Sequence, residues 1–476
     1  MEKLSIEVIS IIIDQLQQDS QLARYATVSR TWQAAVEART FARLQVDSDH
    51  LDRFRSAYSP HPRRQAALRA LDFDVMLPTN TSWGPHHATF HTAFNSLFSL
   101  MHEWEEDQDA SAFGSVQLRL GVHVAARRAD DDADPKSLSH GVEHLQSMRP
   151  DDIASLPAVR RFDRFRIDVS LGQAIDPLTT CQLVLRLPRL QSLQLEYWDP
   201  DRRQRTPRAA YRTWLAEGIR SLRRLPRLTK LCIERRGSEE PDNHGVEVQD
   251  FRDDQGVDIV SEAVRQLAEA GILTELKLVD ILVSPDLFQD RRHSDSTSPT
   301  GQAAAALPWP AMRSFIVHSG IVAPGGAWYY TGDPGAVTPI SSAESGILED
   351  GTEDDDSDDD EGPAHWWRTR PDPDLFNPLA LAMSAAVLRM PRLQAGALTV
   401  GSDHGLCDDL ALQCAVPGEP FCESMGDGMR FADMEYRRWK TWIGGKTEWE
   451  VPAQVRDNWK EFVGEAGKIS VVVYEL

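Results

Sequence analysis

A short apolar pattern recurs along the chain and predicts a series of buried strands. Its core is Leu-x-x-Leu-x-Leu or a close variant, and most copies open with a Leu-Pro-type turn. Copies begin at Leu156, Leu187, Leu225, Ile272, Trp309 and Met390. Successive side chains of a strand point to opposite faces, so the alternating leucines of each copy predict one buried face. We therefore expect the leucines to form the core of a stacked domain.

Helical segments precede several of these strands. Residues 211–225 and 258–270 carry apolar side chains at helical spacing, and 378–390 is strongly apolar, which predicts a helix buried on most sides. Alternating helices and strands joined by short turns favour an α/β fold with a parallel sheet and outer helices. The strand core resembles leucine-rich repeats. However, the copies at Leu187 and Leu225 are 38 residues apart, against about 20–29 in standard repeats. The expected fold is an irregular leucine-rich-repeat-like α/β domain over residues 65–476.

Polar residues alternate with the buried leucines and are expected on the opposite face of the sheet. If that surface holds a partner protein, its contacts fall on these positions. The candidate substrate-binding residues are Gln194, Glu196, Lys230, Glu234, Glu275, Lys277 and His318.

The first 46 residues predict three short helices. Leu4, Val8, Ile12 and Leu16 recur at i+4, which is typical of one stripe of an amphipathic helix. Ser5, Asp19 and Ser29 each precede a helical segment and are suitable N-caps. A unit of this size buries little apolar surface by itself, so we expect it to pack on a partner or on the rest of the chain.

This segment resembles an F-box. The resemblance rests on Leu4-Ser5-x-Glu7-Val8, then Ile12, Leu16 and Leu22, then Val28-Ser29-Arg30-x-Trp32. Ser5 stands where the family usually has proline, and Ser29 stands where it commonly has cysteine. The helix can still start at Ser5, because serine is a good helix cap and proline is a good first-turn residue. The resemblance implies docking to the Skp-type adaptor of a cullin–RING ubiquitin ligase. The adaptor-binding residues implied are Leu4, Glu7, Val8, Ile12, Leu16, Leu22, Val28 and Trp32.

Two further stretches, RTFARLQVDSDHLDRFRSAY and RRQAALRALDFDVMLP, resemble filamentous-fungal F-box proteins in which a long region of undefined function follows the F-box. The expected domains are an F-box at 1–46, a connecting segment at 47–64 and the repeat domain at 65–476. No substrate is implied by this resemblance.

The net charge argues against a nucleic-acid partner. Lys and Arg total 51 and Asp and Glu total 73, which gives a formal net charge of −22. A protein that follows phosphates needs the opposite sign. The apolar stretches are too short or too charged to predict a membrane span, and the N-terminus does not read as a secretory signal. We therefore expect a cytoplasmic or nuclear protein.

Much of the negative charge is local. Residues 349–361 read EDGTEDDDSDDDE, and without them the formal net charge is −12. Like charges repel and bury nothing apolar, so a disordered insert is expected at 331–365. Shorter flexible stretches are expected at 289–306 and 130–136. Ser357 lies in a context suited to an acidophilic kinase; the alternative is a solvating insertion without a role.

Catalytic and cofactor signals are weak. The chain has no G-x-S-x-G elbow, P-loop or H-E-x-x-H motif. His86, His87 and His91 read as a surface loop, and the five cysteines form no C-x-x-C pair. The tryptophans after residue 427 read as the packed end of the domain, with a binding surface as the alternative. No catalytic residue, metal or cofactor is expected.

The sequence therefore favours a non-catalytic substrate-recognition subunit of an SCF-type cullin–RING ubiquitin ligase. Its expected partners are the adaptor, the cullin scaffold and an unknown substrate protein. The alternative is a structural or scaffold repeat protein whose N-terminal helices only cap the fold. An enzyme in the C-terminal region is the third hypothesis.

Overall fold

The computed structural model describes residues 4–16, 22–77, 87–106, 115–124, 147–167, 175–198, 205–236, 241, 243–290, 309–335, 365–401, 410–422, 434–444 and 449–474. The chain divides into two compact units. Unit 1 comprises residues 1–197 and 224–228, and unit 2 comprises residues 198–223 and 229–476.

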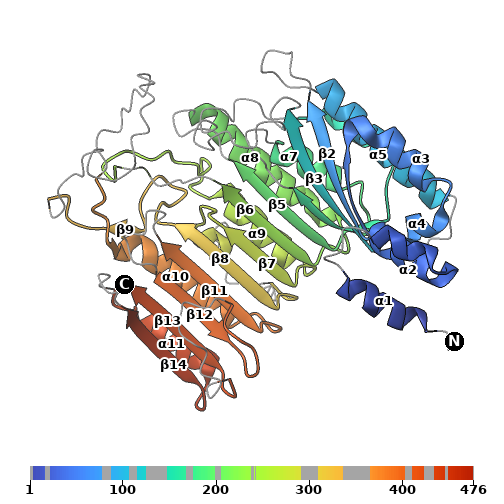
Figure 1. The fold of residues 1–476 in the computed structure, drawn as a ribbon. Coiled ribbons are helices and arrows are strands. Elements are labelled where there is room, and N and C mark those ends of the chain that lie inside the picture. Colours follow the sequence, from blue (N-terminus) through green and yellow to red (C-terminus); the bar gives the residue numbers. More distant parts are fainter. Residues whose placement is uncertain are drawn as a thin grey trace, which may run out of the picture. The chain divides into compact units, whose positions relative to one another are not determined.

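Unit 1 contains a parallel sheet with the strand order β1-β2-β3-β4-β5 (Figure 1). The strands are β1 (Arg43–Asp47), β2 (Ala70–Leu77), β3 (Val116–Val124), β4 (Phe162–Ile167) and β5 (Ser192–Trp198). The helices are α1 (Ile6–Gln15), α2 (Arg30–Thr40), α3 (Leu51–Tyr58), α4 (Pro62–Ala67), α5 (His87–Glu106), α6 (Pro150–Ser155) and α7 (Pro177–Val184), with 3₁₀ turns at Leu22–Thr27 and Ser48–His50.

Unit 2 contains a mostly parallel sheet with the order β6-β7-β8-β11-β12-β13-β14, in which β12 alone runs antiparallel to its neighbours. The strands are β6 (Lys230–Arg236), β7 (Glu275–Val279), β8 (Ser314–Gly320), β11 (Ala395–Gly401), β12 (Leu410–Ala415), β13 (Arg438–Gly444) and β14 (Lys468–Tyr474). The short strands β9 (Tyr330–Thr331) and β10 (Arg370–Pro371) form a separate antiparallel pair.

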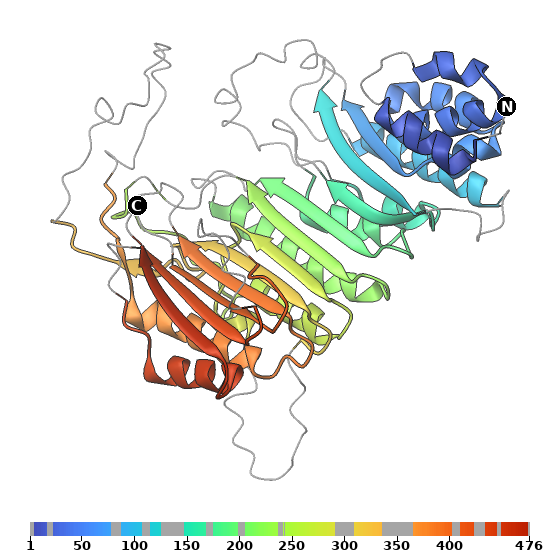
Figure 2. The same cartoon turned by 60° about the horizontal axis from the view of Figure 1, so that its bottom comes forward.

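The helices of unit 2 lie along one face of its sheet (Figure 2). They are α8 (Arg205–Ser221), α9 (Ile259–Glu269), α10 (Pro373–Val387) and α11 (Ala453–Val463), with 3₁₀ turns at Leu222–Arg224 and Pro285–Leu287. The predicted helices at 211–225, 258–270 and 378–390 are thus confirmed, with shifted ends. The mixed α/β class with a mostly parallel sheet is confirmed as well.

The repeated apolar pattern forms the core as predicted. Its strands correspond to β4, β5, β6, β7, β8 and β11, and the apolar positions that face the helices are buried. The residues preceding successive strands hydrogen-bond in series: Thr274 N donates to Thr229 O (2.8 Å), Arg313 N to Thr274 O (2.8 Å) and Gln394 N to Arg313 O (2.7 Å). The repeats therefore enter the sheet in matching positions.

Glycine replaces the Leu-Pro turn in the repeat that begins at Ile272. Gly271 directly follows Ala270, the C-cap residue of α9. Its φ of +79° is a left-handed conformation that commonly ends helices and favours glycine. Its amide donates to Ala268 O at 3.1 Å. This turn brings the chain from α9 into β7 without the proline that the neighbouring repeats use.

The predicted segments 1–46 and 47–64 lie in unit 1, whereas the predicted domain 65–476 spans both units. Residues 1–46 belong to this unit, and β1 at Arg43–Asp47 pairs with β2 in the same sheet. The expected connecting segment 47–64 contains α3 and the start of α4.

Several expected flexible segments lie mainly outside the described residues. Of the expected insert at 331–365, Thr331 belongs to β9 and His365 forms a bridge with Asn243. Residues 336–364, 291–308 and 130–136 lie outside the described residues, as do Asp19, Ser357 and His86.

The C-terminal tryptophans are packed inside unit 2, as the first of the two interpretations predicts. Trp439, Trp442, Trp449 and Trp459 are all buried. Trp439 of β13 stacks on Trp459 of α11, with ring centroids 5.1 Å apart. This stack fixes α11 over β13 at the end of the sheet.

Candidate functional site

The N-terminal helices form a small cluster with its own apolar centre. Ile9 and Ile13 of α1 are buried against Ala35 and Val36 of α2, and Leu22, Tyr25, Ala26 and Trp32 pack around them while partly exposed. Ser5 caps α1 by accepting from Val8 N at 3.5 Å, and Ser29 caps α2 by accepting from Trp32 N at 3.3 Å. Both predicted serine caps are confirmed.

The outer side of this cluster is apolar as well. Leu4, Ile6, Val8, Ile11 and Val28 are 41–62% exposed. They are five of the nine large hydrophobic residues that are exposed in the described part of the chain. We call these five residues the N-terminal apolar surface. A helix that carries apolar side chains outside its own core needs a second partner, because soluble proteins rarely leave such a cluster in water.

The stripe that sequence spacing picked out is therefore divided between two sides of α1. Leu4 and Val8 are exposed, Ile12 and Leu16 are half-buried, and the residues that anchor α1 are Ile9 and Ile13. Spacing alone could not tell the two sides apart because six of the ten residues of α1 are apolar.

Glu7 lies fully exposed in the first turn of α1. A hydrogen bond from the Ser5 side chain lowers the pKa of the Glu7 carboxyl. The favourable position of a carboxylate at a helix N-terminus acts in the same direction. Glu7 therefore presents a fixed negative charge beside Leu4 and Val8.

In unit 2, the predicted polar positions lie on the sheet face opposite the helices. Lys230 and Glu275 are neighbours in register and form an ion pair at 2.7 Å. Lys277 lies one step further along β7 and is exposed, whereas Glu234 and His318 are half-buried. The sheet thus brings Lys230, Glu275 and Lys277 together as an accessible polar patch on β6 and β7, and the alternation predicted from the leucines is confirmed.

The same face is closed further along the sheet. Thr399 of β11 and Gln413 of β12 are buried, and so is Arg438 of β13. The Arg438 guanidinium lies over the Phe421 ring at 4.8 Å, and Cys422 Sγ lies 3.7 Å from Phe315 O. Residues 416–422 therefore cover one end of this face. Of the predicted polar positions in unit 2, Lys230, Glu275 and Lys277 on β6 and β7 remain accessible.

Gln194 and Glu196 belong to unit 1, where the face has a different character. Gln194 pairs in register with Arg166, and Arg166 with Arg119. Glu196 is only 8% exposed and offers little surface to a partner. The arginines Arg119, Arg164 and Arg166 were not predicted, although the alternation Arg-Phe-Arg-Ile in β4 is the signal that places them on this face.

The β1–β3 side of that face is held by internal polar contacts. Asp74 accepts from Gln45 Nε2 at 2.7 Å and lies 3.2 Å from His123 Nε2, and Arg43 pairs with Asp72 at 3.3 Å. Gly121 lies beside this group; a side chain there would come within 2.5 Å of the Asp74 carboxylate. These contacts order the sheet surface.

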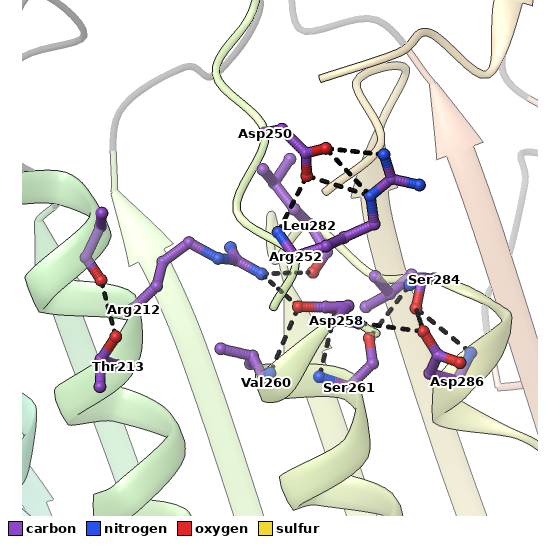
Figure 3. A network of polar contacts seen from close by, with 12 residues as sticks. Arg212, Thr213, Asp250, Arg252, Asp258, Val260, Ser261, Leu282, Ser284 and Asp286 are labelled. Carbon is purple, nitrogen blue, oxygen red and sulfur yellow. Dashed lines mark hydrogen bonds and ion pairs between the residues drawn. The ribbon is translucent and has the colours of Figure 1, made fainter. Parts of the chain in front are cut away.

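A buried polar network occupies the start of α9 in unit 2 (Figure 3). Asp258 caps α9 by accepting from Val260 N and Ser261 N, and its carboxylate also accepts from Arg212 Nη2 of α8 at 3.0 Å. Asp286 accepts from Asp258 N at 3.0 Å and from Ser284 Oγ at 2.9 Å. Both side chains of the Arg212–Asp258 pair are almost fully buried.

An exposed ion pair lies beside this network. Arg252 donates to Asp250 through two nitrogens, at 2.6 and 3.0 Å, and lowers the pKa of that carboxyl. The buried pair, by contrast, joins α8, α9 and the loop that follows β7. Because opposite charges are paired and the helix N-terminus is capped from within the chain, the network is a structural clamp.

The residues considered for metal chemistry do not assemble. His87 and His91 belong to α5, and His87 Nδ1 contacts Ser147 O, so the expected loop is a helix at these two positions. Within the described residues, no group of three or more His, Cys, Asp or Glu side chains could hold a metal ion. In the same part of the chain, no helix has the length and apolar character needed to cross a membrane.

Neither the protein-family models nor the curated proteins contain a match to this chain.

Proposed function

We propose that this chain is the substrate-recognition subunit of an SCF-type cullin–RING ubiquitin ligase, with an F-box at its N-terminus followed by a leucine-rich-repeat-like domain. The observation that carries the proposal is the N-terminal apolar surface. Leu4, Val8 and Val28 occupy positions that the F-box resemblance assigns to the adaptor, and they remain exposed while neighbouring residues form the core.

The N-terminal apolar surface favours association with a partner because its side chains are exposed to water. Exposed aliphatic side chains gain about 25 cal/mol for each Å² removed from water. The N-terminal apolar surface is not covered by the described part of its own chain. A docking partner that buries the N-terminal apolar surface removes these side chains from water. Glu7 adds a charge beside them that orients the partner.

The test uses one helix and two substitutions. Val8→Glu places a charge in the N-terminal apolar surface, while Ser10→Glu places the same charge at an exposed polar position of α1. Affinity purification from cells should show adaptor and cullin with the wild-type chain and with Ser10→Glu. Val8→Glu should reduce both by at least tenfold. Equal recovery with Val8→Glu contradicts the docking surface.

The scaffold hypothesis makes a different prediction for the same experiment. If the N-terminal helices only cap unit 1, the wild-type chain purifies without adaptor or cullin, and deletion of residues 1–40, which spares β1, leaves its other partners unchanged. Recovery of adaptor with the wild-type chain and its loss on that deletion exclude the scaffold hypothesis.

We further propose that the substrate contacts the polar patch on β6 and β7. Lys230, Glu275 and Lys277 are accessible there, and they come from two adjacent strands. A photo-crosslinking residue at Lys277 should capture proteins that accumulate in cells carrying Val8→Glu. The matched position is Glu217, which is exposed on α8. If Glu217 captures the same proteins equally well, the substrate site lies elsewhere.

A further inference from the structure

The last strand of unit 2, β14, is an edge strand of the described sheet. β14 is the terminal strand in the sheet order and pairs with β13; no described strand pairs with its other side. Natural proteins commonly protect such edges with charges, prolines, bulges or a covering segment. β14 reads Lys-Ile-Ser-Val-Val-Val-Tyr, with one charged residue at its start and no proline or glycine. Its sequence therefore contains few of the features that prevent an edge strand from pairing with another strand.

One face of this edge is apolar and exposed. Ile469, Val471 and Val473 are 41%, 48% and 63% exposed. Through the β13 register they lie on the side of Trp439, which is the face that carries α11. The three side chains therefore form an aliphatic row that α11 leaves partly exposed. We call it the β14 row.

We propose that β14 pairs antiparallel with β14 of a second copy of this chain, about a two-fold axis that passes beside Val471 and normal to the sheet. Such an axis keeps the helices of both copies on the same side of one continuous sheet. It is also the symmetry of the commonest closed oligomers, in which one patch contacts itself.

The sequence of β14 is self-complementary in this register. Val471 faces Val471 of the second copy, Ile469 faces Val473, and Ser470 faces Val472. Lys468 faces Tyr474, so no like charges are opposed. Six aliphatic side chains, three from each copy, meet directly across the two strands, where opposite residues have Cβ atoms about 4.5–5.5 Å apart.

The surrounding structure leaves room for this pairing. Strands of a sheet lie about 4.8 Å apart, so the two β13 strands would be roughly 14 Å apart. The Trp439–Trp459 stack ties α11 to β13, and α11 also packs against β14. A helix with its side chains is about 10 Å wide, so the two α11 helices would lie side by side across the axis, next to the two β14 rows.

The charge of the chain favours this contact over others between copies. The formal net charge is −22, so copies repel one another across most of their surfaces. The described residues of β14 include no acidic side chain. Salt should therefore strengthen the association by screening the net repulsion, in contrast to an interface held by ion pairs.

The first test is the oligomeric state of the full chain by sedimentation. We expect a dimer in the micromolar range that tightens as salt is raised. Val471→Lys should weaken the dimer at least tenfold, and Val28→Lys, a matched change at another exposed valine, should not. A monomeric wild-type chain, or a dimer unaffected by Val471→Lys, overturns the proposal. Circular dichroism establishes that both variants keep their fold.

The second test fixes the register by disulfide formation. In a background lacking Cys232, Cys407 and Cys422, Val471→Cys should form covalent dimers rapidly under mild oxidation. Ile469→Cys should not, because that residue lies opposite Val473 and four residues from its own copy. Equal rates for the two variants contradict the proposed register. If instead a substrate strand occupies this edge, the purified chain is monomeric and neither variant crosslinks.

Discussion

At the scale of single residues, burial separates carboxylates that look alike in the sequence. Asp176 caps α7 and accepts from Thr179 N at 2.7 Å, while its Oδ2 is buried without a partner among the described residues. Burial raises the pKa of Asp176. Asp152 lies on the surface, where hydrogen bonds from Arg149 lower its pKa. The two groups should affect stability with opposite dependence on pH.

Asp176→Asn tests the buried carboxylate. Because the folded-state pKa is raised, the native state binds this proton more tightly than the unfolded state does. The negative charge of Asp176 therefore destabilises unit 1 when the pH is above the pKa of Asp176 in the unfolded state. The effect disappears as the pH falls below that pKa. Asparagine keeps the cap and removes the charge. We expect a gain of about 1 kcal/mol at pH 7, since an unpaired buried amide costs less than an unpaired carboxylate oxygen.

Thermal unfolding between pH 3 and pH 8 measures this difference. The gain from Asp176→Asn should shrink toward zero at the acid end. Asp152→Asn is the control and should lower stability slightly at neutral pH, because its carboxylate is stabilised in the folded state. A loss of stability at pH 7 in Asp176→Asn would show that the hydrogen-bonding role of the carboxylate outweighs its burial.

Thiol burial gives a second prediction at this scale. Cys181 and Cys414 are fully buried, and burial raises the pKa of both thiols, whereas Cys232 and Cys422 are half-buried. The thiolate is the reactive form. Site-resolved alkylation at pH 8 should modify Cys232 and Cys422 at least tenfold faster than the buried pair, with equal rates in denaturant. Rapid labelling of Cys181 in the native protein would contradict the packing around α7.

At the scale of elements, the sequence predicts the helices and strands whose apolar residues recur at a regular spacing. The leucine pattern places β5, β6, β7 and β8, and amphipathic spacing places α9, because burial of one face fixes both the element type and its orientation. Strand β2 was less evident. Its Asp72 and Asp74 alternate with apolar residues, and Asp74 is buried beside Gln45 and His123. Those partners are 29 and 49 residues away in the sequence, so no local pattern reveals them.

The buried polar network at the start of α9 was also not predicted from the sequence. Arg212 and Asp258 are 46 residues apart and both look like surface charges. Their burial depends on α8 packing beside α9, which only the folded sheet provides. The candidate site divides in the same way. The polar positions on β6 and β7 follow from alternation, but which side of α1 faces outward required the tertiary contacts of Ile9 and Ile13.

A double-mutant cycle tests this clamp. Asp258→Asn keeps the α9 cap but leaves the buried Arg212 charge without its carboxylate, and should cost about 3 kcal/mol. Arg212→Met should cost a similar amount. The double variant should be less destabilised than the sum by at least about 1 kcal/mol, because neither charge is then left uncompensated. Hydrogen exchange of the α9 amides measures each cost; simple additivity would show that the two side chains do not act as a pair.

At the scale of the whole molecule, charge and association are linked. The run at 349–361 accounts for ten of the 22 net negative charges, and its composition predicts that it adds nothing to the packed core. Replacing it with a neutral Gly-Ser segment of equal length should leave the thermal midpoint within about 1 °C. A larger fall would mean that the run contributes to folding, contrary to its composition.

The same replacement also tests the proposed dimer through its electrostatics. Lowering the net charge from −22 to −12 weakens repulsion between copies. At low salt, where the screening length is about 30 Å, the replaced chain should therefore dimerise more tightly than the wild type. At 1 M salt, where that length is about 3 Å, the two should converge. Sedimentation at both salt concentrations makes the comparison, with Val471→Lys in the replaced chain as the control. If that control still dimerises, the added association arises from general loss of repulsion and not from β14.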